Sequence, residues 1–179
     1  MKTLKTCIIA LVLLSVITGC KKEDSKTSVP AAEEAAAEPA VQVVLDMVVK
    51  KDDTFEMFYV EDESLDFGDN KTRVKVKGKN ESQEIVFNFP DNASIGNLRF
   101  DAGENPEQDE MTINKVIIKQ KDKELELSAA DFFTHFTASG YVKTFPEKFS
   151  FKGIKVNNVY DPMIYGNTTL MHILRELKK

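Results

Sequence analysis

Hydrophobic and polar residues alternate along most of the chain after residue 40. A period of two places apolar side chains on one face of an extended segment, which predicts half-buried β-strands. The clearest examples are 72–77 and 84–89, where valine, isoleucine and phenylalanine occupy every second position. We expect strands at 41–50, 54–60, 72–77, 84–89, 97–101, 111–120 and 124–127, and two more short strands around Gly153.

Two segments have helical features instead. Ser128 could cap a short helix that carries Phe132, Phe133 and Phe136. From 168 to 179, leucine and isoleucine recur at helical spacing, with Asn167 or Thr168 as the cap. Roughly seven to nine short strands with hairpin-length links predict an antiparallel β-sandwich rather than βαβ units. We expect the C-terminal helix to cover an open edge or end of this sandwich.

The first twenty residues follow a different pattern. Lys2 and Lys5 precede an apolar run at 7–17 that only Ser15 interrupts. This run is too short for a membrane-spanning helix, which needs roughly 20 residues. A positive start followed by a short apolar run is typical of a secretory signal peptide.

The run ends in Ile17-Thr18-Gly19-Cys20, which resembles a bacterial lipobox. In proteins of that class the cysteine is lipidated on sulfur, the leader is cut before it, and the new amino terminus is acylated. The resemblance therefore implies a signal peptide at 1–19 and a lipid on Cys20. The alternatives are an ordinary signal peptide with a chance cysteine, or a cytosolic N-terminal helix.

Residues 21–24, Lys-Lys-Glu-Asp, are similar to the export signals of surface lipoproteins in the Bacteroidota. That likeness implies an outer-membrane location, with the periplasmic and cell-surface faces both left open. Residues 20–40 are rich in alanine, glutamate and proline and predict a lipidated, flexible tether. Residues 41–179 then form one domain.

Charge narrows the range of partners. The chain has 24 basic and 29 acidic residues, and loss of Lys2 and Lys5 with the leader gives 22 − 29 = −7. This acidic balance argues against general nucleic-acid binding, which requires a positive surface. The membrane is the expected partner of the lipid, and a glycan or an envelope protein is the expected partner of the domain.

Four strand-like segments resemble a small jelly-roll module of bacterial envelope proteins, which in turn resembles carbohydrate-binding modules. They are 54–59, 86–90, 98–101 and 111–117. The resemblance implies a sandwich fold and a possible glycan ligand, and it assigns no binding residues. Ala102 follows Asp101 where that module often has proline.

Candidate ligand-binding residues come from the strand pattern and from aromatic content. Arg99 and Asp101 point away from the face of Leu98 and Phe100, so they could form an ion pair, or Arg99 could contact a carboxylate or a glycan hydroxyl. We favour the ion pair. The remaining candidates are three tyrosines in segments predicted to be irregular, whose rings could stack on sugars or instead pack under the C-terminal helix: Tyr141, Tyr160 and Tyr165.

Catalytic motifs are absent from the sequence. His135 and His172 stand apart from any ligand-spaced cluster, and no nucleophile motif or phosphate-binding glycine loop occurs. The acidic segments at 61–69 and 104–110 could attract calcium, although neither has the calcium-loop spacing. We expect no catalytic residue, no metal and no cofactor. An accessory subunit of an outer-membrane assembly or export complex is the alternative function, and a hydrolase is less favoured.

Overall fold

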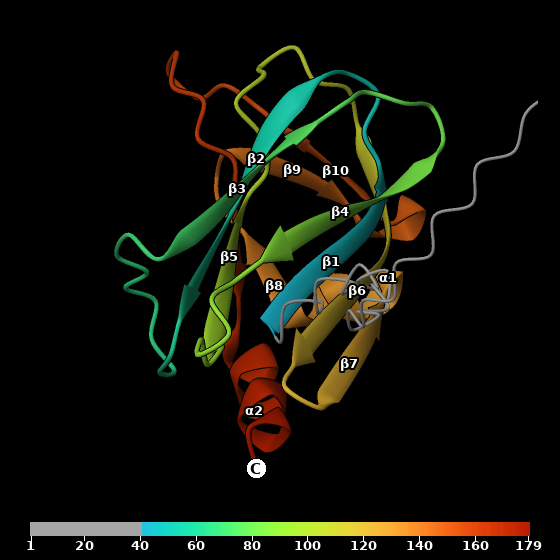
Figure 1. Ribbon diagram of the computed structural model, residues 1–179. Coiled ribbons are helices and arrows are strands. Elements are labelled where there is room, and N and C mark those ends of the chain that lie inside the picture. Colours follow the sequence, from blue (N-terminus) through green and yellow to red (C-terminus); the bar gives the residue numbers. More distant parts are fainter. Residues whose placement is uncertain (1–40) are drawn as a thin grey trace, which may run out of the picture. The chain divides into compact units, whose positions relative to one another are not determined.

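Residues 41–179 are described by a computed structural model. The expected leader at 1–19, Cys20 and the tether at 20–40 lie outside the described residues. Two antiparallel sheets pack against each other, which confirms the predicted β-sandwich (Figure 1).

Sheet A has six strands and sheet B has five. Sheet A runs in the order β4 (Ser82–Asn88), β1 (Val41–Val48), β6 (Met111–Gln120), β10 (Ser150–Gly153) and β9 (Val142–Phe145), and β7 (Lys123–Ser128) also pairs with β6. Sheet B runs in the order β3 (Lys71–Val76), β2 (Asp53–Val60), β5 (Asn97–Asp101), β11 (Met163–Gly166) and β8 (Phe136–Ala138). The chain changes sheet from β1 to β2, from β3 to β4, from β4 to β5 and from β5 to β6, so the connections are jelly-roll-like.

The core lies between the sheets and follows the predicted alternation. Phe100 of sheet B is its centre, with ring centroids 5.4 Å from Phe55, 6.3 Å from Phe87 and 6.3 Å from Phe151. Phe55 belongs to sheet B, whereas Phe87 and Phe151 come from sheet A. Phe100 therefore joins the inner faces of both sheets.

Both predicted helices are present, and each begins at a predicted cap, but Phe136, which was expected on the first helix, begins strand β8 instead. Ser128 caps α1 (Ala129–His135) and exchanges hydrogen bonds with Asp131 in a capping box. Asn167 caps α2 (Thr168–Leu177), and Leu170 and Leu174 are fully buried at the end of the sandwich, where α2 contacts β5, β7 and β11. A short 3-10 turn, η1 (Pro146–Lys148), separates β9 from β10.

The predicted strands around Gly153 are only partly correct. One strand, β10, ends at Gly153, and the next residues form a hairpin tip in which Val156 and Val159 make an isolated bridge. Asn157 and Asn158 both have positive φ, as a tight two-residue turn requires. The sequence pattern also missed β8, β9 and β11, so the described part of the chain has eleven strands rather than seven to nine.

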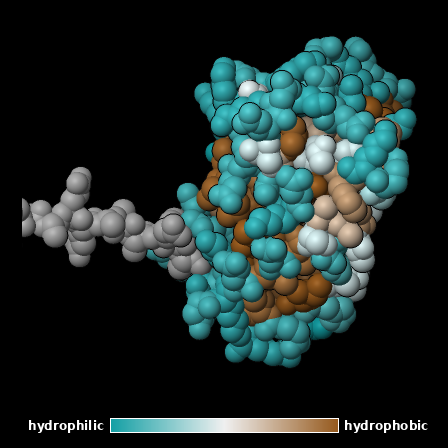
Figure 2. All heavy atoms as spheres, turned by 90° about the vertical axis from the view of Figure 1, so that its right-hand side faces the viewer, coloured by the Kyte–Doolittle hydropathy of each residue, from teal (hydrophilic) through white to brown (hydrophobic). Residues whose placement is uncertain are grey.

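No helix within residues 41–179 has the length and apolar content needed to cross a membrane. On the side of the domain shown in Figure 2, apolar residues reach the surface among hydrophilic ones. The outer face of sheet A has one apolar row across adjacent strands, made by Val86, Val44 and Ile117.

Candidate functional site

The outer face of sheet B has a row of side chains that crosses all five strands. On β2 the inward residues Phe55 and Met57 alternate with Glu56 and Phe58, which face outward. The strand register then places one residue of each neighbouring strand beside Phe58 in turn. The row is Lys71, Phe58, Arg99, Tyr165 and Thr137.

Arg99 is held firmly at the centre of this row. Its Nε lies 2.7 Å from Asp101 Oδ1 and its Nη2 lies 2.9 Å from Oδ2, which is a bidentate ion pair. The guanidinium carbon also lies 3.8 Å from the Phe58 ring centroid and 5.7 Å from that of Phe67. The favoured ion pair is thus present, and it leaves three of the five guanidinium N–H groups for other partners, since 5 − 2 = 3.

Asp101 has an unusual electrostatic environment. Burial raises the pKa of its carboxyl group above the ordinary value, and the hydrogen bonds and charge of Arg99 oppose that rise. The negative charges of Asp161 and Glu56 raise the pKa further. The ion pair is therefore weakened by the acids around it.

A second row of charges lies beside the first. Glu56 is the cross-strand neighbour of Asp101, and its carboxylate lies 3.0 Å from Lys71 Nζ and 3.3 Å from Arg73 Nη1. Arg73 also pairs with Glu104. Both carboxylates at the centre of the face, those of Glu56 and Asp101, are consequently occupied by cations.

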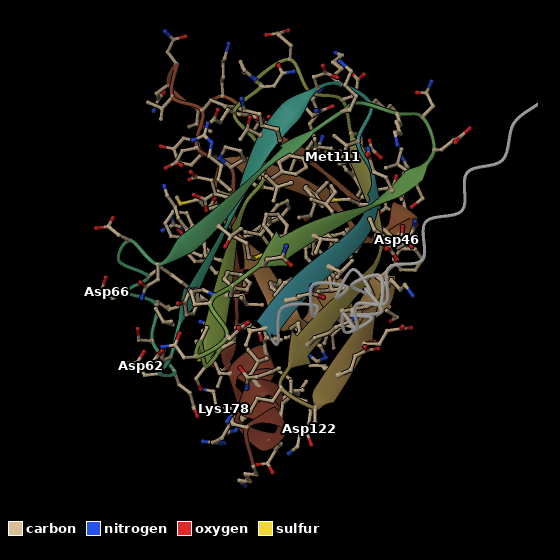
Figure 3. The ribbon with its side chains drawn as sticks, viewed as in Figure 1. Asp46, Asp62, Asp66, Met111, Asp122 and Lys178 are labelled. Atoms are coloured by element: carbon tan, nitrogen blue, oxygen red, sulfur yellow. The ribbon has the colours of Figure 1, made fainter. Side chains whose placement is uncertain are left out.

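The acidic loop at 61–70 folds over this face. Phe67, the one aromatic residue in it, is 3% exposed and packs with Phe58, Val60 and Tyr165. The loop is fixed to the sandwich by a hydrogen bond from Asn97 Nδ2 to the Ser64 carbonyl (3.0 Å). Figure 3 labels Asp62 and Asp66 on this loop, at the margin of the domain. Sequence reasoning treated the loop as acidic and missed Phe67, although an isolated phenylalanine among acids was the available signal.

Two hollows flank the row. The apolar hollow, of about 270 Å³, lies between the acidic loop and the start of α2, and Leu65 on its rim is 63% exposed. Its principal lining residues are Leu65, Thr137, Tyr165, Asn167 and Met171. The acidic hollow, of about 340 Å³, is lined chiefly by Glu56, Asp101, Glu104, Tyr160 and Asp161.

Tyr165 is the best placed of the predicted tyrosines. It lies in strand β11, so its assignment to an irregular segment was wrong. It is the cross-strand neighbour of Arg99, and its hydroxyl donates to Met163 Sδ at 3.0 Å. Burial raises the pKa of its phenol, and the charge of Arg99 partly offsets that rise. Its ring is therefore neutral and partly exposed between Arg99 and the apolar hollow.

Tyr160 and Tyr141 have different positions. The ring of Tyr160 fills the space where a side chain at Gly153 would be, and its buried hydroxyl has no hydrogen-bond partner among residues 41–179. Burial, and then the negative charge of Asp53, raise the pKa of Tyr160 to about 12. Tyr141 lies between β8 and β9, and in the described part of the chain no hydrogen bond or ring contact joins it to Arg99. Arg99 and Tyr165 are thus brought together, Tyr160 lines the adjoining acidic hollow, and Tyr141 is separate.

The remaining titratable candidates form no cluster. Within residues 41–179, no three histidine, cysteine, aspartate or glutamate side chains are placed to hold a metal ion. His135 belongs to α1 and its buried Nδ1 has no partner in the described residues, whereas His172 contacts Arg175 on the exposed side of α2. The two histidines therefore belong to different helices.

Comparison with known proteins found no matching family model, no matching curated protein and no matching solved structure. A function for this protein is therefore inferred from the geometry of the sheet B face.

Proposed function

We propose that this protein is a lipid-anchored, non-catalytic lipoprotein of the outer membrane, and that the outer face of sheet B binds a glycan. The observation that carries the glycan assignment is the adjacency of Tyr165 and Arg99 between two hollows. The lipid on Cys20 would anchor the chain, because each buried methylene contributes about 0.8 kcal/mol and more than one acyl chain gives stable attachment.

The chemistry of the face suits a sugar. A sugar ring has an apolar face, which the partly exposed ring of Tyr165 and the side chain of Leu65 can cover. Its hydroxyls need directional donors, and the free N–H groups of Arg99, the hydroxyl of Thr137 and the ammonium of Lys71 lie in the same row. Because Asp101 fixes the guanidinium, little side-chain entropy would be lost when a ligand binds.

The occupied carboxylates favour binding over hydrolysis. A glycosidase needs one carboxylic acid and one free carboxylate on either side of the scissile bond. Here Glu56 pairs with Lys71 and Arg73, and Asp101 pairs with Arg99. Neither group is free to act on a substrate in this arrangement.

The glycan assignment predicts that the substitution Tyr165→Ala lowers the affinity for the glycan. In the full chain purified in nonionic detergent, we expect affinity for envelope or dietary polysaccharides to fall about tenfold, the loss of roughly 1.4 kcal/mol that one stacking ring contributes. Isothermal titration, after a glycan array has identified the ligand, measures this change.

Tyr141→Ala is the matched control, because Tyr141 lies apart from the row. It should leave affinity unchanged. Equal loss in both variants, or no binding of wild-type protein to any glycan on the array, contradicts the glycan assignment.

The anchor predicts a modified Cys20. Mass spectrometry of the protein isolated from its native membranes should show a first residue of Cys20 with acyl chains attached. An intact leader, or an unmodified thiol on Cys20, would show that the anchor is wrong.

A second candidate is an accessory subunit of an outer-membrane assembly or export complex. The hairpin tip at 154–160 favours it, because Val156 and Val159 are 36% and 50% exposed at the end of the domain opposite α2 (Figure 1). Exposed aliphatic residues on a hairpin turn are suited to a protein partner. Co-purification of a stable partner from detergent-solubilised membranes supports this candidate, and recovery of the chain alone argues against it.

A further inference from the structure

A hollow lined by lysines lies at the end of the domain near the C-terminal end of α2, apart from the sheet B face. Its volume is about 270 Å³. It is formed by the β6–β7 turn, the end of α2 and Ser94, and Figure 3 labels Asp122 and Lys178 at this end. The lysines that line it are Lys121, Lys123, Lys178 and Lys179. We refer to it as the lysine hollow.

Gln120 lines the lysine hollow and brings a side-chain amide to it. The residue is 4% exposed, and its Oε1 accepts a hydrogen bond from Ile95 N at 2.6 Å. That bond fixes the orientation of the amide, since an N–H must face the oxygen. Within residues 41–179 the Nε2 group donates to no other residue. Gln120 lines the hollow, so its Nε2 group is available to donate to an acceptor there.

The positive charge of the lysine hollow is only partly compensated. In the described residues Lys121 and Lys123 form no ion pair, and Lys178 Nζ donates to the Glu61 carbonyl. Lys179 pairs with Glu176 at 2.7 Å. Four lysines against Asp122 and Glu176 give a formal charge of 4 − 2 = +2 around the hollow.

The backbone conformation of Lys121 in the β6–β7 turn suggests a substitution that should not destabilise the protein. Lys121 has φ 59°, a left-handed conformation that favours glycine. A lysine at this position carries a backbone cost that glycine would avoid. Replacing it with glycine therefore removes a charge without an expected loss of stability.

We propose that the lysine hollow is a binding site for a phosphate-type oxyanion. Phosphate oxygens accept hydrogen bonds from an amide nitrogen, a hydroxyl and ammonium groups, and Gln120, Ser94 and the lysines present these donors together. Free phosphate and the phosphate of a lipid headgroup share this chemistry.

The start of the described chain favours a headgroup source. Val41, the first residue of β1, is the cross-strand partner of Gln120 and so lies beside the lysine hollow. The lipid source rests on the proposed anchor, whereas the site itself does not.

Lysine acetylation footprinting of the full chain in vesicles tests the site and separates the two sources. Three samples are compared: phosphatidylcholine vesicles, the same vesicles with inorganic phosphate, and vesicles in which part of the lipid is phosphatidylglycerol, all at equal ionic strength. With phosphate at about ten times its dissociation constant the site is free about a tenth of the time, so acetylation of Lys121 and Lys123 should slow by up to about tenfold. Lys50 and Lys79, exposed at the other end of the domain, are the internal controls.

Slowing by phosphate and by phosphatidylglycerol supports the site with a headgroup source, and slowing by phosphate alone supports it with free phosphate. Slowing by phosphatidylglycerol alone is a general surface effect and overturns the site. No slowing, or equal slowing at Lys50 and Lys79, also overturns it. None of these results depends on glycan binding.

Two variants test the named donors. Gln120→Glu keeps the acceptor for Ile95 N but replaces the amide nitrogen with a carboxylate oxygen, so phosphate protection of Lys121 and Lys123 should be lost. Lys121→Gly should weaken protection of Lys123 severalfold without lowering the unfolding temperature, and it covers the case in which the first variant does not fold. Lys79→Gln, with a comparable loss of charge at the far end of the domain, should leave the phosphate protection of Lys121 and Lys123 unchanged. Full protection in Lys121→Gly would contradict the proposal.

Discussion

At the scale of single residues, Arg99 shows how a strand pattern becomes a site. Residues at i and i+2 share one face of a strand, so Arg99 and Asp101 were expected to be neighbours. The structure adds the ring of Phe58 below the guanidinium. The aromatic contact depends on the register between β2 and β5, which the sequence of either strand alone does not specify.

Asp101 makes the stability of the protein depend on pH in a defined direction. Its pKa is raised in the folded state, so the folded protein binds this proton more tightly than the unfolded chain does. Stability contributed by this group therefore increases as pH falls through the folded-state pKa. Between about pH 7 and about pH 4, the free energy of unfolding of wild type should rise relative to that of Asp101→Asn.

Urea denaturation of both proteins at the two pH values measures this difference. Every other titratable group is present in both proteins, so the difference reports Asp101 together with its coupling to Arg99, Glu56 and Asp161. A relative decrease for wild type on acidification would mean that Arg99 dominates and that the carboxyl pKa is lowered instead.

At the scale of elements, length decides which parts of the fold were predictable. The long alternations at β2, β4 and β6 gave strands near their observed positions. By contrast, β8, β9 and β11 have three or four residues each, too few for an alternation to stand out. Tyr165 was assigned to an irregular segment for this reason, so its position beside Arg99 could not be predicted from the sequence.

The loss of the N-cap of α2 can be measured as a change in the free energy of unfolding. The side chain of Asn167 accepts hydrogen bonds from Thr169 N at 2.9 Å and Leu170 N at 3.3 Å, and its Nδ2 donates to the Thr134 carbonyl. Asn167→Ala should lower the free energy of unfolding by about 1–2 kcal/mol. Chemical denaturation followed by circular dichroism checks this value.

Thr168→Ala is the control for the cap. Thr168 is exposed at the first position of α2, and its substitution should change stability by less than about 0.5 kcal/mol. If the two variants lose equal stability, Asn167 has no special role in starting the helix.

At the scale of the whole domain, the two sheets depend on one aromatic cluster. Phe100→Ala would remove the ring that joins Phe55 of sheet B to Phe87 and Phe151 of sheet A. The expected cost is about 3–5 kcal/mol, a large part of the 5–15 kcal/mol that stabilises a typical domain. The thermal midpoint should fall by many degrees.

Phe145→Ala is the comparison for that change. Phe145 lies near the end of β9, is partly exposed and contacts Lys143 and Lys148 rather than the core rings. Phe145→Ala should lower the free energy of unfolding much less than Phe100→Ala does. Similar midpoints for the two variants would show that the cluster around Phe100 is not what holds the sheets together.

The edge strand β3 has a consequence for encounters between copies of this domain. Its Lys71, Arg73 and Lys75 are exposed at alternate positions along an open edge of sheet B. An unprotected strand edge would let two copies that meet pair into a shared sheet. Charged side chains along β3 oppose such pairing, because a second strand would have to displace the water around Lys75 and around the ion pairs of Lys71 and Arg73. Separate copies can therefore remain individual molecules even when they are crowded.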